Sequence, residues 1–113
     1  MLSGEEEAQR NADINFQLEK LKGRRQEIHC RITLICNEMA KIMRRVGSRT
    51  SLNRLVDQAE ELLLRSHKLN DQICVFKDKV DTAKEFQTQL RYQRAVEDAK
   101  EDVQRFSAEL FQT

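Results

Sequence analysis

The stretch that decides the fold is INFQLEKLKGRRQEIHCRITLICNEMAKIMRRV, which spans residues 14–46. An apolar residue recurs in it every seven residues, and a second row lies four residues after the members of the first. The first row is Ile14, Leu21, Ile28, Ile35 and Ile42, and the second is Leu18, Arg25, Ile32, Met39 and Val46. Two rows with this repeat indicate a coiled-coil seam or the buried stripe of a long bundle helix.

Arg25 is the one polar residue in these two rows. We expect its aliphatic stem to cover apolar neighbours while its guanidinium reaches out to a carboxylate. The alternative is a buried polar residue that fixes the register or the partner of the helix, as single polar seam positions can do.

The composition of the chain indicates long helices. Of its 113 residues, 35% are charged, three are glycine and none is proline. Compact mixed folds need turns, and turns draw on Gly, Pro, Asn and Asp. The sequence therefore predicts an all-α fold, organised as a single elongated helical domain over residues 1–113.

A turn at residues 47–51, Gly-Ser-Arg-Thr-Ser, separates two helices, because it offers a glycine to end one and a Ser or Thr to cap the next. The first helix is predicted over about 4–46 and the second from about 52, antiparallel to the first because the connection is short. The second seam is formed by Leu52, Leu55, Ala59, Leu62, Ser66, Leu69, Ile73, Phe76, Val80 and Ala83.

Two arrangements of the C-terminal third follow. In the first, which the sequence favours because no Gly or Pro interrupts it, the second helix runs to about residue 112 in a long antiparallel hairpin. In the second, the chain breaks near residues 80–88, where Thr82 and Glu85 have the spacing of a capping box, and forms three helices.

The three-helix arrangement resembles a spectrin-type repeat, since segments 16–46, 52–80 and 83–112 have nearly equal lengths. The resemblance rests on length and period, and it implies a three-helix bundle. The chain departs from the pattern because it has no tryptophan, and Phe16 is the aromatic residue near the start of its first helix.

In the hairpin arrangement the C-terminal third overhangs the shorter first helix, and its apolar residues need a partner chain. Leu63 and Leu64 also widen the apolar stripe beyond a simple seam, which indicates a further neighbouring helix. We expect another helical protein or a second copy, as a homodimer, to contact this surface. The predicted interface consists of Leu63, Leu64, Val96, Val103, Phe106 and Leu110.

Basic residues gather around the turn, and no acidic residue occurs between Glu38 and Asp57. Such a cluster attracts an acidic peptide, phosphate or an anionic lipid. The simpler interpretation is that cations near a helix C-terminus complement its dipole. The candidate residues for an anionic partner are Lys41, Arg44, Arg45, Arg49 and Arg54.

The sequence offers no constellation for catalysis and none for a cofactor or small-molecule substrate. His29 and Cys36 are seven residues apart, as are His67 and Cys74, whereas two metal ligands on one helix need a spacing of three or four. The carboxylates lie among lysines and arginines on solvated helix faces. We therefore expect a protein that is not an enzyme and binds no metal.

The net charge of +1 indicates neither nucleic acid nor a membrane surface as the general partner, and no apolar run is long enough to cross a bilayer. Three cysteines, an odd number, favour reduced thiols in the cytoplasm or nucleus. The sequence thus predicts an intracellular structural module, a coiled-coil subunit or fragment that mediates protein–protein assembly. The alternative is a binding module that contacts an anionic surface through the basic turn.

Overall fold

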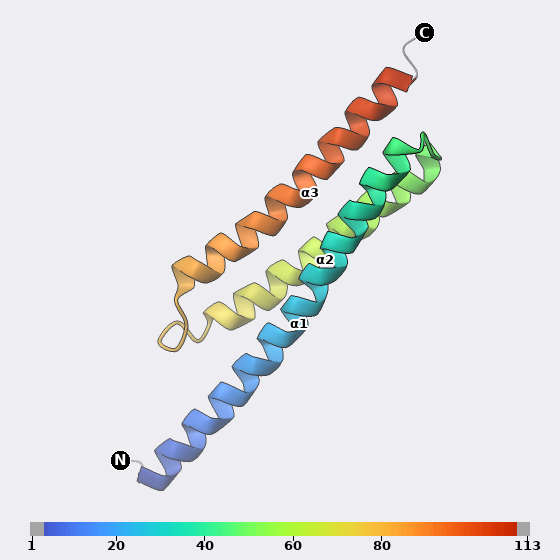
Figure 1. Cartoon of the computed structure of the whole chain (residues 1–113). Coiled ribbons are helices and arrows are strands. Elements are labelled where there is room, and N and C mark those ends of the chain that lie inside the picture. The colour runs from blue at the N-terminus through green and yellow to red at the C-terminus, as the bar shows by residue number, and fades with distance from the viewer. Residues whose placement is uncertain (1–3, 111–113) are drawn as a thin grey trace.

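The computed structural model describes residues 4–110 and consists, over that range, of three helices and no strands. The helices are α1 (Gly4–Arg44), α2 (Arg49–Cys74) and α3 (Thr82–Leu110). As Figure 1 shows, α2 runs back along α1, and α3 turns again to run in the direction of α1. The rod that they form measures 74 × 19 × 16 Å. The all-α prediction is confirmed, in the three-helix arrangement.

The predicted unbroken second helix over 52–112 is wrong, because α2 ends at Cys74 and residues 75–81 form a loop. This loop lies mostly before the predicted break at residues 80–88. It contains no Gly or Pro, and α3 begins directly after it at Thr82. Asp81 is the residue that caps α3, since its Oδ1 accepts a hydrogen bond from the Lys84 backbone N–H at 3.2 Å. The cap is therefore one residue earlier than the predicted Thr82, and the predicted end near residue 112 lies outside the described range.

Packing of α3 against both other helices closes the core. Ile32 and Met39 of α1, Leu52 and Ala59 of α2, and Val103 of α3 are all at most 2% exposed. Burial of this apolar surface is the main favourable contribution to folding. The predicted overhang of the C-terminal third is therefore wrong: α3 returns along the rod and buries its seam within the same chain.

An overhang does exist, but at the opposite end of the chain. The N-terminal part of α1 projects beyond the 75–81 loop (Figure 1), and residues 4–17 precede the first buried residue of this helix. Every residue in this range is exposed except Ile14, which is half-buried, and the first buried residue of α1 is Leu18. We call residues 4–17 the N-terminal arm.

The α1–α2 turn has the hydrogen bonds of a Schellman motif, with Gly47 N–H donating to Ile42 C=O (2.8 Å) and Val46 N–H donating to Met43 C=O (3.2 Å). The left-handed position of this motif is occupied by Val46, with φ of 51°, although glycine is the usual residue there. Gly47 is needed for a different reason, since a Cβ at this position would lie 2.7 Å from Ile42 Cγ2. Ser48 then caps α2, which begins at Arg49, inside the predicted turn.

Val46→Gly is expected to stabilise the fold by about 1 kcal/mol, because a left-handed backbone costs a β-branched residue roughly 1–2 kcal/mol and the exposed side chain packs little. Gly47→Ala is expected to lower the melting temperature, because its new methyl group meets Ile42. Thermal unfolding followed by circular dichroism measures both changes. A Val46→Gly variant no more stable than the parent would contradict the strained conformation.

Candidate functional site

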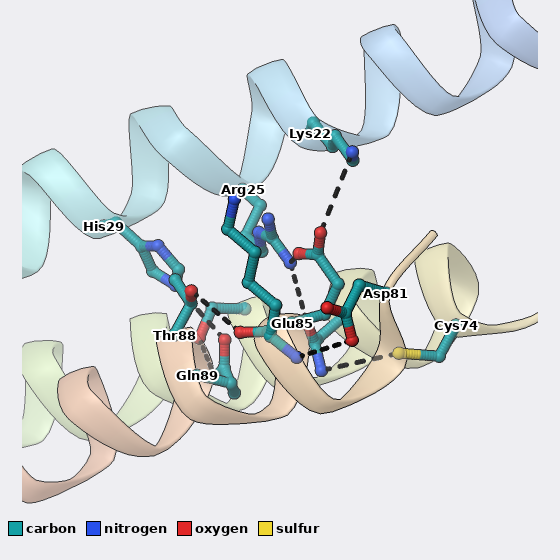
Figure 2. A network of polar contacts seen from close by, with 11 residues as sticks. Lys22, Arg25, His29, Cys74, Asp81, Glu85, Thr88 and Gln89 are labelled. Carbon is teal, nitrogen blue, oxygen red and sulfur yellow. Dashed lines mark hydrogen bonds and ion pairs between the residues drawn. The ribbon is translucent and has the colours of Figure 1, made fainter. Parts of the chain in front are cut away.

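A buried polar layer crosses the bundle, with one residue from each helix (Figure 2). Arg25 Nη1 donates to Asn70 Oδ1 at 2.7 Å and lies 2.6 Å from Glu85 Oε2. All three side chains are buried, and Lys22 reaches the other Glu85 oxygen from the surface at 3.7 Å. We call Arg25, Asn70 and Glu85 the arginine layer. The guanidinium reaches a carboxylate, as expected, but inside the bundle rather than at its surface.

A second layer lies one helical turn further along the rod and consists of His29, Ser66 and Gln89. Gln89 Nε2 donates to Ser66 Oγ at 2.7 Å, and Gln89 Oε1 lies 3.2 Å from His29 Nε2. Because an amide oxygen only accepts hydrogen bonds, Nε2 carries the hydrogen of the neutral imidazole. The ring of Tyr92 stacks on His29 with centroids 3.7 Å apart and an interplanar angle of 12°. We call this set the histidine layer.

The two layers constrain the pairing of all three helices. Each helix supplies two residues four positions apart, and the order is reversed in the antiparallel α2. The pairs are Arg25 and His29 in α1, Ser66 and Asn70 in α2, and Glu85 and Gln89 in α3. A shift of any helix would place these polar groups opposite apolar residues and leave them unpaired, which is costly in a core. Within the described residues, every buried side-chain nitrogen or oxygen has a partner.

Burial lowers the pKa of His29 below its usual value, and the positive charge of Arg25 lowers it further, while the hydrogen bond with Gln89 opposes the shift. The carboxylate of Glu85 is held by Arg25 in the neighbouring layer. Protonation of His29 would therefore place a second cation in the core, one turn away from Arg25.

Two of the cysteines, Cys36 and Cys74, have surroundings that disfavour the thiolate. Burial raises the pKa of Cys36. The pKa of Cys74 is also raised, first by desolvation and then by the negative charges of Glu85 and Asp71, although Arg25 opposes this. A raised pKa keeps a thiol protonated and reduces its reactivity as a nucleophile. Cys30 is the exposed one of the three.

His29 is expected to make the bundle less stable in acid. Near neutral pH the imidazole is uncharged in both states, but below about 6.5 the unfolded chain takes up a proton that the folded chain resists. The free energy of unfolding should therefore fall as the pH drops through this value, and level off below the lowered folded-state pKa. Urea unfolding at a series of pH values measures this slope.

His29→Gln should remove that part of the slope, whereas His67→Gln, which changes the other histidine, should retain it. A slope that is unchanged in His29→Gln would contradict the role of His29. Comparison of the two variants also separates the contribution of His29 to this slope from that of carboxylates, which titrate at lower pH.

Removing one partner of the buried ion pair should be strongly destabilising, because Arg25 then has no carboxylate in the core, or Glu85 retains only Lys22, at 3.7 Å, as a cationic partner. Arg25→Met or Glu85→Leu is each expected to cost about 3–5 kcal/mol, and the double variant considerably less than the sum of the two. Chemical denaturation measures all three. The exposed pair Arg65–Glu61, at 2.8 Å, is the matched control, where the same substitutions should be nearly additive. Additive effects at Arg25 and Glu85 would contradict the coupling.

The basic residues predicted to bind an anion are all exposed and lie around the α1–α2 turn, the end that we call the basic tip. Arg45 is 3.6 Å from Glu38, so part of the positive charge is compensated. Beside the tip lies a surface groove between α1 and α2. It is lined by Leu34, Ile35, Asn37, Glu38, Ala40, Lys41, Arg44 and Leu55, and we call it the tip groove.

Most residues predicted to form the helix seam lie inside the bundle, but Ile14 lies in the N-terminal arm, and Phe76 and Val80 lie in the 75–81 loop rather than in the predicted second helix. None of the predicted seam residues is exposed. The predicted seam residues are Ile14, Leu18, Leu21, Ile28, Ile32, Ile35, Met39, Ile42, Leu55, Leu62, Leu69, Ile73, Phe76 and Val80.

Most residues predicted to form a partner interface also belong to the bundle. Val96 and Val103 are buried in the core, and Leu63 and Phe106 are half-buried against it. The prediction that these four form an unpaired surface is wrong, because the return of α3 covers them. Leu64 and Leu110 remain exposed.

Sequence reasoning missed four of the six layer residues and the exposed Leu34 of the tip groove. The missed layer residues are His29, Asn70, Glu85 and Gln89. The sequence did contain a signal, a second polar residue four positions after the polar residue of each seam. His29 lies four residues after Arg25, and Asn70 lies four residues after Ser66. Glu85 and Gln89 had the same spacing, but their role depended on the return of α3.

Comparison with protein-family models, curated proteins and solved structures gives no match for this chain. Over residues 4–110, no helix is apolar over a long enough stretch to cross a lipid bilayer. The same residues contain no grouping of three His, Cys, Asp or Glu side chains suited to a metal ion.

Proposed function

We propose that this chain is a non-enzymatic structural module that mediates protein–protein assembly by docking other helices. The observation that carries the proposal is the N-terminal arm, the 14 residues, or about 21 Å, of α1 that precede its first buried residue. An isolated helical segment of this length is marginal in water, and helices gain most of their stability by packing an apolar face. A partner helix beside the arm would supply that packing.

The apolar residues of the arm support this role. Ile14 continues the seam of α1, and Phe16 exposes 67% of its surface. Aromatic residues are among the most common anchors of protein interfaces, because they bury a large area with few rotatable bonds. Phe16 is thus the residue that we assign to partner contact, because Ile14, two residues earlier, points to another side of the helix and is already half-buried.

The polar layers support a scaffold rather than an enzyme. Their hydrogen-bonding groups are paired within the chain, and the buried charge of Arg25 is matched by Glu85. Such groups are used to specify the pairing of helices. The rod would then hold its two ends at a defined separation. The free thiols of the described residues suit the intracellular setting, cytoplasmic or nuclear, that we propose for the assembly.

The basic tip supports a second function, the binding of an anionic partner. Lys41, Arg44, Arg45, Arg49 and Arg54 are all exposed there. Leu34 and Leu55 place apolar surface beside this charge in the tip groove, which favours an amphipathic protein segment over a simple phosphate.

A photo-reactive amino acid at position 16 is expected to cross-link the protein to a partner chain in extracts of cells that produce it. The same group at position 64 is the control, because Leu64 is similarly exposed, at 63%, but lies on the bundle surface. Mass spectrometry of the adducts identifies the partner, whether another protein or a second copy. Adducts that are absent at position 16, or equal at both positions, would contradict the docking role of the arm.

A further inference from the structure

We propose that the tip groove binds the N-terminal arm of a second copy of this chain, so that copies join head to tail. This inference rests on the proposed function and names the partner of the arm. It draws on two surfaces that the bundle leaves uncovered, one at each end of the rod.

The tip groove combines apolar and basic groups. Leu34 is 66% exposed and lies beside Ile35 and Leu55, while Lys41 and Arg44 supply positive charge. Its one acidic residue, Glu38, pairs with Arg45 at 3.6 Å. The lining comes from α1 and α2, and none of the described residues of α3 belongs to it. The groove therefore suits a helical segment that carries both acidic and apolar side chains.

The N-terminal arm has this chemistry. It is helical, and its first turn carries Glu5, Glu6 and Glu7, followed by Asp13, against the single basic residue Arg10. Ile14 and Phe16 supply its larger apolar side chains. An acidic helical segment and a basic, partly apolar groove are complementary in charge as well as in polarity.

The shape of the molecule makes the contact intermolecular. The arm and the tip lie at opposite ends of a rod 74 Å long (Figure 1), so a copy cannot fold its own arm into its own tip groove. The two surfaces differ, so the contact is heterologous, and each copy retains one free arm and one free groove after pairing. Repetition of such a contact gives open chains unless the rotation between copies closes a ring.

Charge swapping between two variants tests the contact. One variant carries Glu5→Lys, Glu6→Lys and Glu7→Lys in the arm, and the other carries Lys41→Glu and Arg44→Glu in the groove. All five positions are exposed, and circular dichroism checks that each variant remains helical. Light scattering across protein concentration, at low and high salt, measures the mass of each variant and of their mixture.

We expect the wild-type chain to associate with rising concentration at low salt and to dissociate at high salt. Each charge variant alone should be monomeric, because arm and groove then repel, and the mixture should associate again. Leu34→Ser should weaken association, whereas Leu64→Ser, at a similarly exposed leucine, should leave it unchanged.

A wild-type chain that stays monomeric would overturn the inference, as would association that ignores both charge reversals or a mixture that fails to associate. A failure of this inference can be distinguished from a failure of the proposed function by the cross-linking experiment at position 16. If position 16 cross-links to a different protein while the purified chain is monomeric, the arm is a docking site but its partner is another protein. If position 16 gives no specific adduct and the chain is monomeric, both proposals fail.

Discussion

The structure depends on the buried contact between Arg25 and Glu85, whose Nη1 and Oε2 atoms are 2.6 Å apart. Both charges are largely removed from water in the bundle, so removal of Glu85 leaves Arg25 without a carboxylate, and removal of Arg25 leaves Glu85 with only the more distant Lys22. Because Glu85 is in α3 and Arg25 is in α1, the charge of Arg25 is matched only when the third helix returns along the first. Asn70 of α2 joins the same contact, so the pair constrains all three helices together.

The histidine layer extends this constraint by one turn and adds a dependence on pH. His29 is held between Gln89 and the ring of Tyr92, both in α3, and burial lowers its pKa. Two successive polar layers contribute less to stability than well-packed apolar ones of the same volume, but they discriminate against shifted pairings. A rod with one defined register presents its two ends at a fixed distance, which is the property that an assembly module needs.

The function that we propose follows from what this constraint leaves uncovered. The layers and the apolar core bury the seam of α3, so the C-terminal third does not offer the unpaired seam that the sequence predicted. The surfaces that stay uncovered include an acidic arm at one end and a basic groove at the other. The arm and the groove are complementary in charge, and only two different copies can bring them into contact.

The sequence by itself determined the elements whose signals are local: the seven-residue repeat from Ile14, the all-α class and the turn around Gly47. It also showed Arg25 and Ser66 as polar exceptions on the seams. Only the tertiary structure decided that α3 returns, and hence which apolar residues are core and which end overhangs. The physical reason is that the cap at Asp81 is a weak local signal, common inside helices as well. The return is stabilised instead by contacts such as His29–Gln89, between residues far apart in the chain.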